Sequence, residues 1–547
     1  MLRRVPAFLA PALAALAALW PCLGNGFVSW DDDRFILRNP HFQGWTMENL
    51  RWILTPSWPQ GGHYDPLTWL SFSLDWSIWG LDPFGFHLTS LLIHAAGAAV
   101  FYAVARRLLA AAGASRAELS ALFAAVFFAV HPLRVESVAW ATERSDVLSG
   151  LFYLLTVLFY LDRKMRLSLA CFAASLLSKS IGMTLPLVLV LLDLCPLGRL
   201  PASPARWLDK GYRAVWKEKL PFLLLALAAA GVAAYLQLGS GAMRGLDSLS
   251  LLERAGIAAY AMAFYVGKTV FPASLLPLYP MPPDLGVLSW RMVLSATTLA
   301  LVTTLAVMRA RSRPAFLAAW AFYIITVLPV SGLAHTGPQL AADRYTYLSC
   351  LGWALLGGWA VALLPGPKAW LAGSAWLLTL GSLAWSQCGV WKDTETLWRT
   401  TAEKDPGHFV ARNFLANIRA GQGRDREALE LYFQALSLHP GYGSAHNNLG
   451  NLLVRSGRPE DSLPHYEAAL KASPGHRAVH YNWGLALMLL GRGSEAAGHF
   501  REELLLEPGH EPSKKALEAA LRLKKRPEKK SPQEAKPPAG KNAQGGI

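Results

Sequence analysis

The chain has 547 residues, of which 53% are apolar and only 16% charged, and its formal net charge is +15. A soluble domain carries about 25% charged residues, so this composition excludes an ordinary soluble protein. The five cysteines include no CxxC pair, which argues against a zinc site or a disulfide framework. The basic residues lie mostly between apolar runs and in the C-terminal tail, which indicates membrane topology rather than nucleic-acid binding.

Long apolar stretches run through residues 1–390. Four of them contain no Asp, Glu, Lys or Arg at all, namely 221–243, 314–342, 345–367 and 369–391. A helix that crosses a bilayer needs about 20 mostly apolar residues. Because backbone polar groups in lipid must be satisfied internally, these stretches are predicted to be helices.

The basic clusters fix a predicted topology, because Lys and Arg favour the cytoplasmic side of a membrane. Placing all of them inside gives eleven spans, with the N-terminus inside and the C-terminus outside. Segment 254–271 is then an in-plane or re-entrant helix, since a crossing there would move Arg309–Arg313 to the outside. The first apolar run is interpreted as an uncleaved helix rather than a signal peptide. The predicted spans are 5–24, 87–108, 118–133, 147–161, 167–179, 181–196, 220–239, 290–308, 314–330, 346–364 and 369–388.

The segment 25–86 is predicted to be an external loop. Its tryptophans favour the lipid–water interface, so parts of it are expected to lie along the membrane surface. The loop is acidic, with three basic residues against seven acids: Asp31, Asp32, Asp33, Glu48, Asp65, Asp75 and Asp82.

A repeat of 34 residues marks the C-terminal third. Pro406, Pro440, Pro474 and Pro508 are spaced by this period, and each is followed by Gly. This is the length of a tetratricopeptide repeat (TPR), a pair of antiparallel helices. The sequence predicts an all-α chain: a polytopic membrane bundle over 1–390 and a soluble TPR α-solenoid over 391–523. The solenoid has three full repeats, a partial leading repeat at 394–405 and a capping helix at 511–523, and the basic tail 524–547 is predicted to be disordered.

Three adjacent carboxylates, Asp31, Asp32 and Asp33, open the external loop. Their mutual repulsion favours a raised pKa on at least one of them. Such a group is suited to act as a general base on a hydroxyl or to hold a divalent metal. A solvated acidic turn is the alternative, so no cofactor or metal is assigned.

Further ionisable residues are predicted to face the same side, next to apolar spans. Such residues are expensive near a bilayer and are candidates for function. Arginine and lysine suit a phosphate, whereas pairing among themselves or snorkelling to the interface are the alternatives. The candidates are His131, Arg134, Glu136, Arg144, Asp146, Lys179, Asp343, Arg344 and Tyr345.

Several blocks of sequence, in their order along the chain, resemble the transmembrane-and-TPR (TMTC) family of protein O-mannosyltransferases and their bacterial relatives. The TPR array after the last span completes the resemblance, which covers almost the whole chain except the tail. The matching blocks are Trp30–Asp33, Asp65–Ser71, His131–Leu148, Leu177–Leu187 and Ala342–Tyr347.

The resemblance implies a GT-C-type glycosyltransferase that moves a hexose such as mannose, with inversion, from a polyprenyl-phosphate donor to a protein Ser/Thr hydroxyl. Asp32, with Asp31 or Asp33 as alternates, would be the base. Arg134, Arg144, Lys179 or Arg344 would stabilise the departing phosphate. The TPR groove would bind the acceptor protein, and the expected location is a bacterial inner membrane with the TPR domain in the periplasm. A non-catalytic TPR scaffold, or an O-antigen ligase or polymerase, is the alternative.

Overall fold

The computed structural model describes residues 6–56, 64–240, 250–281, 289–333, 339–363, 367–476 and 478–524. The chain forms two compact units, Met1–Asp405 and Pro406–Ile547. Both are helical, as the sequence predicts. The domain boundary predicted at residues 390 and 391 stays a prediction, and the tail beyond residue 524 lies outside the described residues.

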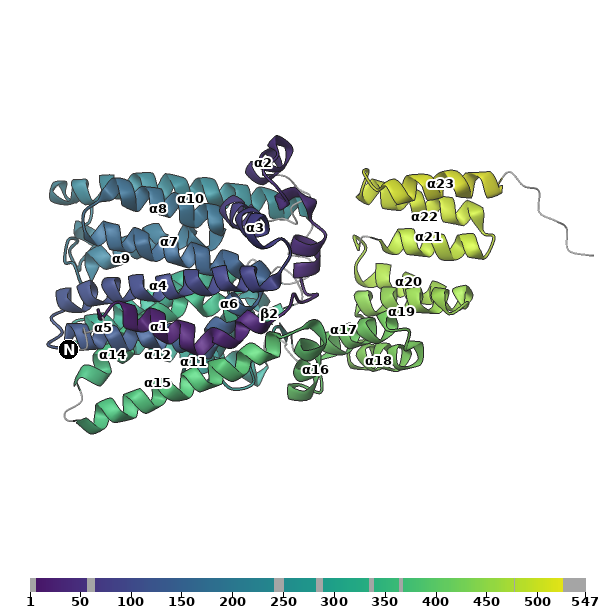
Figure 1. The fold of residues 1–547 in the computed structure, drawn as a ribbon. Helices are drawn as coiled ribbons and strands as arrows, with labels where there is room; N and C mark the ends of the chain where they lie inside the picture. The colour runs from purple at the N-terminus through teal and green to yellow at the C-terminus, as the bar shows by residue number, and fades with distance from the viewer. Residues whose placement is uncertain are drawn as a thin grey trace, which may run out of the picture. The chain divides into compact units, whose positions relative to one another are not determined.

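The helices of the first unit run side by side, and the short helices α2 and α3 lie at one end of this bundle (Figure 1). The only strands among the described residues are β1 (Tyr279–Pro280) and β2 (Gln339–Ala341), which pair antiparallel. The α-helices are α1 Leu9–Leu19, α2 Met47–Leu54, α3 Pro66–Trp79, α4 Pro83–Ala111, α5 Ala117–Val130, α6 Val135–Ala139, α7 Arg144–Leu161, α8 Met165–Ser178, α9 Leu185–Leu194, α10 Arg213–Ser240, α11 Leu251–Val270, α12 Trp290–Met308, α13 Pro314–Val327, α14 Thr346–Leu363, α15 Pro367–Cys388 and α16 Thr394–Lys404.

Most of these helices are apolar, and several are long enough to cross a membrane. Among the described residues, five segments are long and apolar enough to cross a membrane: Pro83–Ala111, Ala141–Leu161, Lys210–Gln237, Trp290–Met308 and Asp343–Leu363. A sixth would be the pair Ala117–Val130 and Pro132–Ala139, which is bent by 55°. Shorter apolar helices and α15 coincide with the other predicted spans. The total of eleven crossings stays a prediction.

The predicted spans 167–179 and 181–196 require the chain to reverse around Lys179, and this reversal is present. The start of α8 and the end of α9 both lie beside the last turns of α7, because Ser168 donates a hydrogen bond to the Thr156 carbonyl and Tyr160 donates to the Asp193 carboxylate. Lys179 therefore occupies the turn at the opposite end, between α8 and the 3-10 helix η7 (Ser180–Thr184).

Helix α11 fits the predicted in-plane or re-entrant segment. Near its start, Arg254 donates a hydrogen bond to the Leu333 carbonyl beyond α13. Near its end, the Thr269 carbonyl contacts His131, which lies at the end of α5. Both contacts belong to connections that the predicted topology places on the external side. The arrangement favours a helix that enters and leaves on one side.

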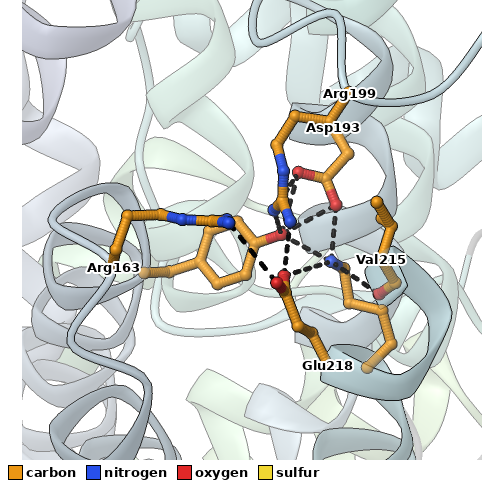
Figure 2. Close-up of polar contacts among 7 residues, drawn as sticks. Arg163, Asp193, Arg199, Val215 and Glu218 are labelled. Atoms are coloured by element: carbon orange, nitrogen blue, oxygen red, sulfur yellow. Dashed lines mark hydrogen bonds and ion pairs between the residues drawn. The ribbon is translucent and has the colours of Figure 1, made fainter. Parts of the chain in front are cut away.

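A network of buried ion pairs ties α7, α9 and α10 together at the end of the bundle that carries the basic connections. Figure 2 shows Arg199 between the Asp193 and Glu218 carboxylates, at N–O distances of 2.9 and 2.5 Å. Lys219 lies 2.5 Å from the other Asp193 oxygen and donates a hydrogen bond to the Tyr160 hydroxyl. The carboxylate of Asp193 is fully buried, so these pairs supply the polar contacts that it loses from water.

The second unit consists of antiparallel helix pairs with a final helix. Glycine is required at equivalent positions of two repeats, Gly450 and Gly484, because a larger residue would clash. A Cβ atom on Gly450 would lie 2.7 Å from Tyr466, and one on Gly484 would lie 2.5 Å from Phe500. Each first helix thereby approaches the second helix of its own repeat. The pairs are α17 Phe409–Gly421 with α18 Asp425–Leu438, α19 Gly443–Arg455 with α20 Pro459–Ala472, and α21 Val479–Leu489 with α22 Gly493–Leu506, followed by α23 Glu511–Lys524.

We expect the substitution Asp193→Ala to lower the free energy of unfolding by about 3–5 kcal/mol, because it leaves two cations without their buried partner. The measurement is thermal unfolding of the purified chain in detergent, followed by tryptophan fluorescence. Asp209→Ala is the control, since its pair with Arg206 is mostly exposed and such pairs contribute about 0–1 kcal/mol. Equal shifts in the two variants would contradict the proposed stabilising role of the network.

Candidate functional site

Four charged side chains form a continuous ion-pair chain where the connections after α5, α8 and β2 meet. Glu143 stands at its centre, with one oxygen 2.6 Å from the Lys179 Nζ and the other 3.4 Å from the Arg344 Nε. Lys179 also lies 2.8 Å from Asp146. Segments that are 200 residues apart in sequence therefore share one electrostatic unit.

Three buried hydrogen bonds fix Arg344 and Asp146, the outer members of this chain. Glu136 accepts from both the backbone and the guanidinium of Arg344, at 2.8 and 2.5 Å. Ser137 donates to the second oxygen of Asp146 at 2.9 Å. Arg344 also lies over the Trp140 ring, 5.3 Å from its centroid. Glu136, Asp146 and Arg344 are buried, whereas Glu143 and Lys179 are partly exposed and form the accessible part of the cluster.

Asp31 lies beside this cluster and has the properties of a general base. It is partly exposed, and its carboxylate has no hydrogen bond to any described residue. Desolvation and the nearby Glu143 carboxylate raise the pKa of Asp31 to about 7, although Arg344 and Arg34 oppose the shift. A carboxylate with a pKa near the working pH is suited to accept a proton from a hydroxyl.

Asp32 plays a different part from its neighbour. Its side chain is fully buried and accepts hydrogen bonds from the Val28 amide at 3.0 Å and from the Thr142 amide at 2.9 Å, as well as from the Thr142 hydroxyl. The external loop is thereby fastened to the connection before α7. Burial raises the pKa of Asp32 to about 6, against these hydrogen bonds. Asp33 lies further out, 3.9 Å from the exposed Arg38.

Arg144 is separate from the ion-pair chain. Its guanidinium is fully buried in an ion pair with Asp75 and donates to the Phe86 carbonyl at 2.8 Å and to Ser71 at 3.2 Å. It also lies over the Phe72 ring. All of these partners belong to α3 and α4, so Arg144 holds the external loop against the bundle. Its partner Asp75 was visible in sequence only as one of seven acids in the loop.

Arg134 is also fully buried, but it is incompletely paired. One nitrogen donates to Thr346 at 2.5 Å, and the guanidinium lies over the Tyr347 ring. No described residue accepts a hydrogen bond from Nε or Nη1. Missing hydrogen bonds on a buried charge are costly, so the incomplete pairing of Arg134 lowers the stability of the fold.

The remaining predicted residues have local partners. His131 accepts from the Leu133 amide through Nδ1 and contacts the Thr269 carbonyl through Nε2, so both ring nitrogens are occupied. Asp343 accepts from the Tyr279 hydroxyl at 2.9 Å. The Tyr345 hydroxyl accepts from Gln339 at 2.7 Å.

Carboxyl groups outnumber cations around the accessible part of the cluster. Asp65, which directly precedes α3, joins Asp31 there, and its burial raises its pKa to about 7 in spite of the nearby Lys179. The raised pKa values relieve part of the repulsion, because a protonated carboxyl carries no charge. No group of three metal-ligating side chains occurs within the described residues, so the geometry offers no ready metal centre there.

The segment after the last membrane helix is built into the same region. Ser29 donates to the Thr394 hydroxyl at 2.9 Å, and Gly26 donates to the Lys392 carbonyl at 2.8 Å. The Trp30 and Trp398 rings meet edge to face, 5.0 Å apart. Helix α16, predicted as a partial leading repeat, is therefore fixed to the external loop beside Asp31.

Comparisons with known proteins agree with both units. A family model described as "Tetratricopeptide repeat" matches residues 411–444, and another with the same description matches 447–510. The chain is 38% identical to the protein O-mannosyl-transferase Tmtc2 of Drosophila melanogaster over 193 residues, which are 31% of this chain and 20% of that protein. Drosophila Tmtc1 is 35% identical over 192 residues, with 32% and 21% of the two chains covered.

Over about a third of its length the chain is similar to TMTC proteins. Mouse TMTC3 also matches it, at 34% identity over 155 residues, with 27% of this chain and 16% of that protein covered. The predicted family resemblance and the predicted TPR repeats are thereby confirmed. The match spans about a fifth of the length of these relatives.

Among solved structures, "Crystal structure of YrrB: a TPR protein with an unusual peptide-binding site" covers 29% of this chain and 78% of its own, at 19% identity and a TM-score of 0.22. The "Crystal structure of MamA protein" covers 24% and 71%, at 15% identity and a TM-score of 0.22.

We expect the substitution Asp32→Ala to loosen the external loop, because it leaves the amides of Val28 and Thr142 without an acceptor. Each unsatisfied buried group costs about 1–3 kcal/mol. The measurement is the rate of trypsin cleavage after the exposed Arg34 and Arg38 in the folded chain. Asp33→Ala is the control and should change the rate little. An unchanged cleavage rate in Asp32→Ala would contradict the conclusion that the hydrogen bonds of Asp32 hold this loop in place.

Proposed function

We propose that the chain is a membrane glycosyltransferase that moves a hexose, mannose by its relatives' names, from a polyprenyl phosphate to a protein Ser/Thr hydroxyl. The observation that carries this proposal is the placement of Asp31 beside the ion-pair chain of Glu143, Lys179 and Arg344. A base of suitable pKa and cations suited to a phosphate lie together there. Relatives whose names state O-mannosyl transfer support the choice of reaction.

In the proposed reaction, the Asp31 carboxylate accepts the proton of the acceptor hydroxyl as its oxygen forms a bond to the anomeric carbon of the sugar. The bond from that carbon to the phosphate oxygen breaks on the opposite face, so the configuration inverts. Polyprenyl phosphate leaves with the electron pair. We favour Asp31 over Asp32 as the base, because every hydrogen bond of the Asp32 side chain is directed to the protein's own backbone and Thr142.

Lys179 is the preferred cation for the departing phosphate. It is partly exposed, whereas Arg344 is buried and bound on two sides by Glu136 and Glu143. An incoming phosphate would compete with Glu143 and Asp146 for Lys179. Cations held in place before the reaction stabilise developing negative charge with little reorganisation. Arg144 has a full set of internal partners and is left with a structural role.

The site opens, by the predicted topology, on the external side of the membrane, which is the periplasm if the chain belongs to a bacterial inner membrane. The TPR unit supplies an extended surface suited to peptide segments and would bind the acceptor protein. A non-catalytic scaffold would have little need for five ionisable side chains at the bilayer's edge, since buried charges are costly to maintain.

We expect Asp31→Asn to lower sugar transfer by about 10²–10⁴-fold, because the amide cannot accept the proton. The measurement is transfer from polyprenyl-phosphate sugars to acceptor protein by the purified chain. Asp33→Asn is the matched control and should retain activity, since Asp33 lies outside the cluster. Full activity in Asp31→Asn, with unchanged thermal unfolding, would remove Asp31 as the base.

The pH profile should follow the ionisation of the base. Because burial raises the pKa of Asp31 to about 7, the base form is lost as the pH falls below that value. The expected kcat/KM therefore decreases about tenfold per pH unit below about 7 and is level above it. Steady-state rates between pH 5 and 8, with Asp33→Asn in parallel, provide the measurement. A profile without a break in this range contradicts the assignment.

A further inference from the structure

A cavity of about 440 Å³ lies between helices α4, α7, α9, α13 and α14. Its walls are almost wholly apolar, with Leu108, Val157, Leu192, Ala318 and Leu355 on the five helices in turn. This volume is in the range of binding pockets for small organic molecules. Its lining suits a hydrocarbon chain, since an empty apolar cavity forgoes the contacts that its walls would otherwise make.

The cavity is remote from the candidate site along the bundle. Helix α7 begins at Arg144, beside the site, whereas Tyr153 and Val157 line the cavity. At 1.5 Å per residue these positions are about 14 and 20 Å further along the helix. The cavity therefore belongs to the half of the bundle that ends at the basic connections, and not to the accessible ion-pair cluster around Glu143.

A turn rich in arginine lies at the cavity's border. Ser312 and Arg313 are among the lining residues, and Arg309, Arg311 and Arg313 are all exposed. None of the three is in an ion pair with a described residue. Their guanidinium groups are therefore available to an anion from outside the chain, and arginine pairs well with phosphate.

The network of Figure 2, at the same end of the bundle, shows the contrast. There the Arg199 guanidinium lies between Asp193 and Glu218, and the Lys219 ammonium also contacts Asp193. These cations already have anionic partners within the chain. The turn Arg309–Arg313 combines unpaired positive charge with an adjoining apolar cavity, and this combination matches the two ends of an anionic lipid.

We propose that the cavity holds an acyl chain of an anionic phospholipid, whose phosphate is bound by Arg309, Arg311 and Arg313. The lipid comes from the leaflet at the basic end of the bundle, which is the leaflet opposite the candidate site. It fills the space between α13–α14 and α4–α7–α9. This lipid is not a reactant, so its binding does not depend on the proposed glycosyl transfer.

The test is native mass spectrometry of the full chain, purified in detergent and offered phosphatidylglycerol or phosphatidylcholine in equal amounts. The wild type should retain one phosphatidylglycerol and at least tenfold less phosphatidylcholine. Replacing Arg309, Arg311 and Arg313 together by Gln should lower retention of phosphatidylglycerol at least tenfold. Arg206→Gln is the matched control, since Arg206 is also exposed on a basic connection but is not among the residues that line the cavity.

Two variants test the cavity itself, Ala318→Phe and Leu355→Trp, each of which fills part of it. Either variant that keeps the unfolding midpoint of the lipid-free wild type should lose the retained phospholipid. Three results would overturn the proposal: retention unchanged in the folded filled variants, equal retention of the two phospholipids, or a retained mass equal to that of a polyprenyl phosphate. The last result would place the donor's own hydrocarbon chain in the cavity instead.

Discussion

The pairing of Glu143 with both Lys179 and Arg344 is the constraint around which the external end of the membrane unit is arranged. A cation near a bilayer must find an anion or return to water. Glu143 supplies one carboxylate to two cations that come from different parts of the chain. The connections after α5, α8 and β2 must therefore meet at one point. Asp31 lies beside this point, so a carboxylate suited to accept a proton is next to the paired cations.

The two ends of the membrane unit use charge differently. At the basic end, Asp193 is enclosed by cations and a tyrosine hydroxyl, so its network stabilises helix packing and offers little to a ligand. At the external end, carboxyl groups are in excess and Lys179 stays partly exposed. An unequal balance of charge has a cost in stability, and it is retained where binding or catalysis requires it.

Much of this arrangement could be predicted from the sequence, because its signals are local or periodic. Apolar length predicts the helices, and the 34-residue period predicts the TPR pairs. The reversal at Lys179 follows from the alternation of basic connections. The division of labour between Asp31 and Asp32 could not be predicted, since it depends on which carboxylate meets the amide of Thr142, 110 residues away. Likewise, nothing local distinguishes Arg144, which is sequestered by Asp75, from a cation that is free to bind phosphate.

The shared carboxylate of Glu143 also has an evolutionary consequence. A single substitution at Arg344 would remove an ion-pair partner from both Glu136 and Glu143. A substitution at Glu143 would leave Lys179 with Asp146 and Arg344 with Glu136, so each cation would lose one of its carboxylate partners. Single changes at these positions are therefore expected to be harmful, whereas compensated pairs are tolerated. Across homologous chains we expect four positions either to be conserved or to change in a correlated way: Glu136, Glu143, Lys179 and Arg344. Positions separated by about 200 residues would then co-evolve.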